Sequence, residues 1–201
     1  MKPQLIFVTL GAMLLASSVA AQSCADGKTL TEGTLTIATG NPAYYPWVMD
    51  DAPESGNGFE AAVAYALAEK MGFAANSVAW TRTSFDQAIQ PGTKDFDLNI
   101  QQFSITEDRD KIVDFSASYY TAPMAVLVRS ADNLEPTMEQ LKGLVWGAAA
   151  STTGLPMITD TIAPVASTLI YDDNANIVEA MKAGQIDAAL FDLPTALYLS
   201  A

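Results

Sequence analysis

The stretch Thr-Leu-Thr-Ile-Ala-Thr-Gly-Asn-Pro, residues 34–42, sets the pattern that decides the fold. Apolar and small polar residues alternate over 34–39, which predicts a strand, and Gly40-Asn41-Pro42 ends it. Apolar residues at helical spacing over 59–71 then predict a helix that Gly72 closes. A strand followed by a helix of this length is typical of α/β folds, in which the helix crosses over to a parallel strand.

The rest of the first half repeats this alternation. Residues 77–80 predict a second strand, Ser84 caps a short helix that ends at Ile89, and residues 96–100 predict a third strand. The order is therefore strand, helix, strand, helix, strand. This order indicates a parallel sheet with crossover helices.

A second unit of the same kind follows. Strands are predicted at 144–149, 168–171 and 187–191, with a helix from 154 to about 162 and a helix that Asn174 caps and Gly184 ends. The segment between the halves, residues 113–128, is rich in β-forming residues and predicts an extended crossing. The fold class is α/β with two lobes, each a mainly parallel sheet flanked by helices.

The N-terminus is typical of an export signal. Lys2 precedes an apolar run and then Ser17-Ser18-Val19-Ala20-Ala21, which predicts a signal peptide over 1–21; the alternative is an N-terminal membrane anchor or buried helix. The domains that follow are lobe I over 22–118 and the hinge crossing with lobe II over 119–201. Cys24 leaves lipid anchoring as an alternative to a free exported protein.

Composition excludes several classes of function. The net charge of −13, from 23 acidic and 10 basic residues, disfavours nucleic acid and anionic membrane surfaces as partners. The absence of histidine removes Ser-His-Asp and Cys-His systems, and the single cysteine removes an intrachain disulfide framework. We expect no metal and no cofactor.

Polar and aromatic residues follow the predicted strands, where ligands bind in open α/β sheets. Arg109 falls in the first turn of a helix that Thr106 caps, so an anion should compensate it: Glu107, Asp108 or a ligand carboxylate. A solvated arginine is the alternative. Asp192 ends an apolar strand and either points into the crevice or caps the helix that begins at Pro194.

Further candidates complete a site for a zwitterion. Hydroxyls and backbone amides at the start of a helix favour an anion, and aromatic rings favour an apolar or planar group, although such rings are also common in cores. The candidate binding residues are Tyr44, Phe85, Gln102, Ser104, Arg109, Thr152, Thr153 and Asp192.

The sequence resembles the periplasmic amino-acid-binding proteins of ABC importers, which have the type 2 periplasmic binding fold. The matching segments are Gly58-Phe59-Glu60, Asp97, Ser104-Ile105-Thr106 to Arg109, 113–120, 184–189 and Asp192. The resemblance implies that Arg109 binds an α-carboxylate and Asp192 an α-amino group. It also implies that Gln102, Ser104 and Thr153 complete the shell and that Tyr44 and Phe85 pack on the side chain.

The same resemblance implies a monomer in the periplasm that closes on an amino acid by hinge motion near 115–123 and delivers it to an ABC permease. The family often has small residues where Gln101 and Gln102 stand, which leaves the preferred amino acid open. Family members also continue past the position of Ala201, so the fold is expected to be incomplete at its C-terminus.

Two other functions remain open at this point. An enzyme on the same fold, a lyase like cyclohexadienyl dehydratase, would need a carboxyl group with a raised pKa in the cleft. The acidic pairs Asp50-Asp51 and Asp172-Asp173 lie in turn-like contexts and are expected to be solvated, so we expect no enzyme. The ligand-binding portion of a sensory receptor is the third alternative.

Overall fold

The computed structural model describes residues 25–129, 134, 135 and 137–201. The predicted signal peptide and Cys24 lie outside these residues. None of the helices in the described part of the chain has the length and apolar character needed to cross a membrane.

The first sheet has three parallel strands in the order β2-β1-β3, with the strand nearest the N-terminus at its centre. Its elements are β1 (Leu35–Gly40), β2 (Val78–Thr83), β3 (Leu98–Asn99), α1 (Phe59–Lys70), α2 (Phe85–Ile89), α3 (Glu107–Asp110) and three short 3-10 helices at Met49–Asp51, Pro53–Ser55 and Ala75–Ser77. Leu35 and Ile37 of β1 pack against Ala64 and Ala68 of α1 to form its core. We call this part of the molecule lobe I.

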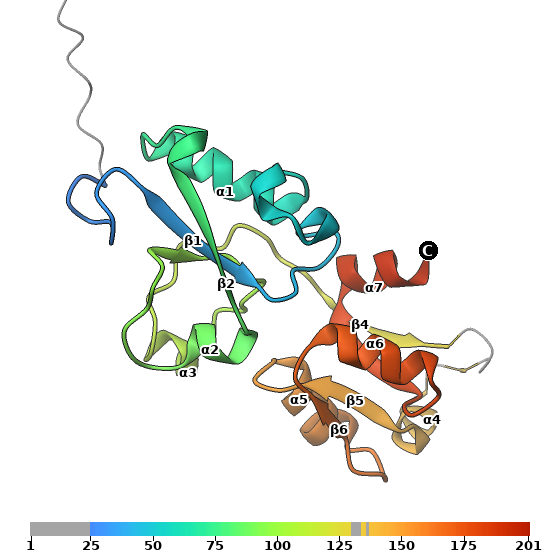
Figure 1. The fold of residues 1–201 in the computed structure, drawn as a ribbon. Helices are drawn as coiled ribbons and strands as arrows, with labels where there is room; N and C mark the ends of the chain where they lie inside the picture. Colours follow the sequence, from blue (N-terminus) through green and yellow to red (C-terminus); the bar gives the residue numbers. More distant parts are fainter. Residues whose placement is uncertain (1–24, 130–133, 136) are drawn as a thin grey trace, which may run out of the picture.

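The second sheet has four strands in the order β4-β7-β5-β6, and only β4 runs antiparallel to its neighbour. Its elements are β4 (Met124–Val128), β5 (Trp146–Ala149), β6 (Leu169–Tyr171), β7 (Ala188–Asp192), α4 (Met138–Gly143), α5 (Gly154–Pro156), α6 (Asn174–Lys182) and α7 (Leu193–Ser200). Trp146 and Ile158 are fully buried in its core. We call this part lobe II, and Figure 1 shows the two lobes as separate units joined by the extended segment before β4.

The expected α/β fold with two lobes is confirmed, and three local expectations change. The strand predicted over 96–100 is shorter and covers Leu98–Asn99. The preceding Asp97 carboxylate accepts the N–H groups of Leu30 and Thr36 at 2.7 and 2.8 Å. The helix predicted from 154 to 162 divides into α5 and a π-helical turn, Met157–Ile162.

The third change concerns the cap of α6. The prediction that Asn174 caps this helix was wrong, because Asn174 is its first residue and Asp173 is the cap. The Asp173 carboxylate accepts the backbone N–H of Asn176 at 2.9 Å. By contrast, Ser84 caps α2 as expected, through a reciprocal capping box with Gln87.

The lobes also contact each other through α7. The Trp47 indole N–H of lobe I donates to the Thr195 hydroxyl of α7 at 2.9 Å, in a buried position. Tyr45 stacks on Tyr198 with ring centroids 4.7 Å apart. These contacts fix the C-terminal helix of the described chain against the loop that follows β1.

Candidate functional site

A cavity of about 230 Å³ lies between the lobes, with walls from both sheets. Lobe I supplies residues that follow β1, β2 and β3, and lobe II supplies residues at the ends of β5, β6 and β7. All of the candidate residues from the sequence lie on its wall: Tyr44, Phe85, Gln102, Ser104, Arg109, Thr152, Thr153 and Asp192.

Arg109 is 8% exposed and comes from the first turn of α3, where Thr106 accepts its backbone N–H as the helix cap. Its guanidinium donates to the carbonyl oxygens of Ser104 at 2.9 Å and Ser151 at 2.7 Å. The guanidinium also lies 5.5 and 5.2 Å from the ring centroids of Phe85 and Phe103. Burial lowers the pKa of Arg109, but an arginine remains charged at neutral pH.

No carboxylate of the described residues forms an ion pair with this buried guanidinium. The adjacent Asp108, one of the expected partners, pairs with Lys111 at 2.7 Å, and Glu107 is exposed. The alternative of a solvated arginine is wrong, since Arg109 is buried. A positive charge on the cavity wall is therefore left without a negative partner, which favours an anionic guest.

The segment 101–104 is anchored by Glu60, a fully buried carboxylate in the first turn of α1. Glu60 accepts the backbone N–H of Gln102 at 2.9 Å, and it also bonds to the Gln102 side-chain amide and the Tyr119 hydroxyl. Gln102 has a φ of 54°, which is unusual for a residue other than glycine. Burial raises the pKa of Glu60, although its three donors act in the opposite direction.

The hydroxyls of lobe II have different partners. Ser151 donates to the Asp86 carboxylate of lobe I at 2.6 Å, and Thr152 donates to the carbonyl oxygen of Ala149 at 2.8 Å. The Thr153 hydroxyl lies 3.5 Å from that of Ser104 across the cavity. Neither threonine side chain caps α5, so capping does not account for their presence on the wall.

Asp192 is the last residue of β7 and occupies the position that precedes α7. Asp192 is the N-cap residue of α7, but its side chain makes no capping hydrogen bond, so capping does not account for the carboxylate. The carboxylate is half-buried on the cavity wall, and burial raises its pKa. Asp192 takes part in none of the ion pairs among the described residues, so the cavity carries a second unmatched charge, on the lobe opposite Arg109.

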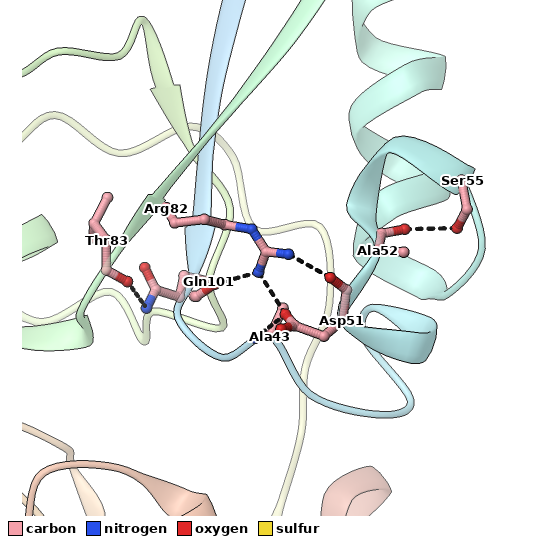
Figure 2. A network of polar contacts seen from close by, with 8 residues as sticks. Ala43, Asp51, Ala52, Ser55, Arg82, Thr83 and Gln101 are labelled. Carbon is pink, nitrogen blue, oxygen red and sulfur yellow. Dashed lines mark hydrogen bonds and ion pairs between the residues drawn. The ribbon is translucent and has the colours of Figure 1, made fainter.

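Tyr44 lies on the loop that follows β1, and Figure 2 shows how Arg82 contacts Asp51 of the same loop. Arg82 donates to the Gly40 carbonyl at 2.7 Å and pairs with Asp51 at 2.6 Å, and Asp51 also accepts the N–H of Ala43 at 2.8 Å. Burial pushes the pKa of Asp51 up, but the bonds from Ala43 and Arg82 bring it below its ordinary value. Asp51 is exposed, as expected for a solvated acidic pair, and it also forms these bonds with Ala43 and Arg82.

The wall also has polar residues that were not among the candidates, and two of them are Gln101 and Asp173. Gln101 is buried, with its amide 3.5 Å from the Thr83 carbonyl, and Asp173 is half-buried at the start of α6. The expectation of a solvated acidic pair holds for the exposed Asp172 but not for Asp173. A signal for Asp173 was present, because it follows a strand as Asp192 does.

Comparison with known proteins places the chain among solute-binding proteins. Residues 35–189 match the family described as bacterial extracellular solute-binding proteins, family 3. The glutamine-binding protein of Geobacillus stearothermophilus is 31% identical over 143 residues, which are 70% of this chain and 54% of that protein. The histidine-binding periplasmic protein of Escherichia coli K12 is 26% identical over 189 residues, which are 93% of this chain and 69% of that protein.

Solved structures share the fold. The ancestral amino acid-binding protein AncCDT-1, described as a precursor of cyclohexadienyl dehydratase, aligns with a TM-score of 0.69 and 30% identity. The alignment covers 84% of this chain and 74% of AncCDT-1. This chain spans little more than half the length of the Geobacillus stearothermophilus protein.

Proposed function

Since the chain belongs to family 3 of the bacterial extracellular solute-binding proteins, we propose that it captures a free amino acid in the cavity between its lobes. The observation that carries this proposal is the pair of unmatched charges, the buried Arg109 guanidinium and the half-buried Asp192 carboxylate on opposite lobes. An α-amino acid carries the two complementary charges within one small molecule. The names of the relatives, which bind glutamine and histidine, support the same class of ligand.

In this proposal, Arg109 binds the α-carboxylate. A guanidinium has five N–H donors, and two hydrogen bonds to carbonyl oxygens leave donors for a carboxylate. The hydroxyls of Ser104, Thr152 and Thr153 and the amide of Gln102 would complete the shell. Asp192 would receive the α-ammonium group, and Tyr44 and Phe85 would flank the side chain.

Occupancy would be coupled to closure of the lobes, because the ligand bridges groups of lobe I and lobe II. The crossing near residues 115–123 would act as the hinge. The closed protein would then deliver the amino acid to an ABC permease as a periplasmic monomer. The signal peptide predicted over 1–21 and the periplasmic relative support export.

A thermal-shift screen of the purified protein against the common amino acids tests the proposal. A ligand at about 100 times its dissociation constant adds about 2.7 kcal/mol of stability. We expect at least one amino acid to raise the unfolding temperature and its α-amide or decarboxylated analogue to fail. No response to any amino acid would contradict the proposal.

A lyase resembling cyclohexadienyl dehydratase is the second candidate. The raised pKa of Asp192, caused by burial, supplies the kind of acid that such an enzyme needs, and AncCDT-1 supports the connection. We propose binding without turnover. Incubation with prephenate, followed by detection of phenylpyruvate, distinguishes the two, since only the enzyme would form product.

A further inference from the structure

The wall of the cavity carries more negative than positive charge. Among the described residues that line it, Arg109 is the one cationic side chain, whereas Asp172, Asp173 and Asp192 are carboxylates. If an amino acid binds as proposed above, its α-carboxylate matches Arg109 and its α-ammonium matches Asp192. An acidic pair at the start of α6 then remains without a counter-charge.

Asp173 is the member of this pair that faces the cavity from a half-buried position, while Asp172 is exposed. Its two carboxylate oxygens accept the backbone N–H and the side-chain amide of Asn176 at 2.9 and 3.0 Å. The Tyr44 side chain also hydrogen-bonds to this carboxylate, so these three bonds leave one of its about four acceptor positions for a ligand. Among the described residues, none of the ion pairs involves Asp173.

Tyr44 of lobe I lies close to Asp173. Burial and the Asp173 carboxylate raise the pKa of Tyr44, and bonds from the backbone N–H groups of Ala175 and Asn174 offset part of this effect. The phenol therefore stays neutral and adds no counter-charge. Its ring lines the cavity, and aromatic faces attract cations.

From this arrangement we infer that the protein selects amino acids with a cationic side chain, an ammonium or a guanidinium, which Asp173 receives beside Tyr44. This inference rests on the proposed function. A neutral side chain would leave the Asp173 carboxylate unmatched when the lobes exclude water, and an acidic side chain would add repulsion. The net charge of −13 also attracts cationic ligands to the molecule.

The competing explanation is that Asp173 only caps α6. The substitution Asp173→Asn separates the two roles, because asparagine caps helices as well as aspartate does but carries no charge. Asp160→Asn is the matched control, since Asp160 is an exposed carboxylate of lobe II that does not line the cavity. Thermal unfolding of each variant confirms that the fold is retained.

The experiment is calorimetric titration of the purified protein with L-arginine, L-lysine, L-glutamine and L-glutamate at neutral pH. We expect arginine or lysine to bind at least about tenfold more tightly than glutamine and glutamate to bind weakest. Asp173→Asn should lower the affinity for the cationic ligand about tenfold or more. The affinity for glutamine should change less than about threefold. Asp160→Asn should leave all four affinities unchanged.

Three results would overturn the inference. If glutamine or glutamate binds wild type as tightly as arginine and lysine do, the inference fails while the proposed function stands. If Asp173→Asn weakens every ligand equally, Asp173 is a structural cap and not a selector. If no amino acid binds, the proposed function fails as well. If Asp173→Asn does not fold, the affinities of wild type for the four amino acids test the inference by themselves.

Discussion

Arg109 of lobe I donates from Nη2 to the carbonyl oxygen of Ser151 of lobe II at 2.7 Å. The same serine donates from its hydroxyl to the Asp86 carboxylate of lobe I at 2.6 Å. Ser151 therefore holds the two lobes together by both its backbone and its side chain, next to the cavity. The guanidinium that we assign to ligand binding therefore contacts both lobes, through the carbonyl oxygens of Ser104 and Ser151.

Replacing Arg109 by alanine should weaken amino-acid binding by about 2–5 kcal/mol, the cost of removing one partner from a buried charge pair. Titration calorimetry measures the loss. Lys111→Ala is the control, because it removes one exposed positive charge from the same region, outside the cavity wall. Equal affinity of Arg109→Ala and wild type would show that the carboxylate binds elsewhere.

Ser151→Ala should weaken binding about two- to tenfold, since it removes one hydrogen bond worth about 0.5–1.5 kcal/mol. Because the bond to Asp86 joins the lobes, Ser151→Ala should increase the rate of ligand release and leave the rate of association nearly unchanged. Stopped-flow measurements separate the two rates. The control is Thr159→Ala, whose hydroxyl bonds only to Asp160 and Pro156 within lobe II. An unchanged release rate would contradict this prediction.

The positions of Arg109 and Asp192 on the cavity wall could be predicted from the sequence for a topological reason. Both follow strands of parallel sheets, and the carboxyl ends of such strands share one edge where ligands bind. The same rule applies to Asp173, which follows β6. It was missed because an acidic pair in a turn also fits a solvated surface, and local sequence does not show which residues a second lobe covers.

Glu60 shows what the sequence could not reveal. Its partners Gln102 and Tyr119 stand 42 and 59 residues away along the chain. No local periodicity predicts contacts at that separation, and a glutamate in the first turn of a helix is already explained by the helix dipole. The resemblance included Glu60 in a motif but gave no reason for it. The structure supplies one, since the carboxylate positions the segment that carries Gln102 and Ser104.

Glu60→Gln should lower the free energy of unfolding by about 1–3 kcal/mol, because the new amide directs N–H donors at groups that are themselves donors. Urea denaturation measures the change, and Glu69→Gln, an exposed substitution on the same helix, should leave stability within about 0.5 kcal/mol. Tyr119→Phe removes only one of the three hydrogen bonds to the Glu60 carboxylate. It should therefore lower the free energy of unfolding less than Glu60→Gln does. A Glu60→Gln variant as stable as wild type would mean that the carboxylate anchors nothing.

Amino-acid affinity should fall as the pH is lowered, and Asp192 should cause the fall. Burial raises the pKa of Asp192 in the free protein, whereas a bound ammonium favours the ionised carboxylate. Ligand binding therefore releases a proton below this raised pKa, and affinity should drop by about tenfold for each further pH unit. The loss should begin at a higher pH than the ordinary value of about 3.9 for aspartate allows.

Protonation of Asp192 should have the opposite effect on folding, because it stabilises the folded state while it weakens ligand binding. A loss of binding at low pH can therefore be distinguished from unfolding. A carboxyl whose pKa is higher in the folded than in the unfolded state is stabilised by protonation, so titration of Asp192 does not unfold the protein as the pH falls. Asp192→Asn should bind weakly at neutral pH and show a flatter pH profile over the same range. Glu60 is the other buried carboxyl with a raised pKa, and burial is again the cause. A steep profile that survives Asp192→Asn would contradict the placement of the α-ammonium group at Asp192.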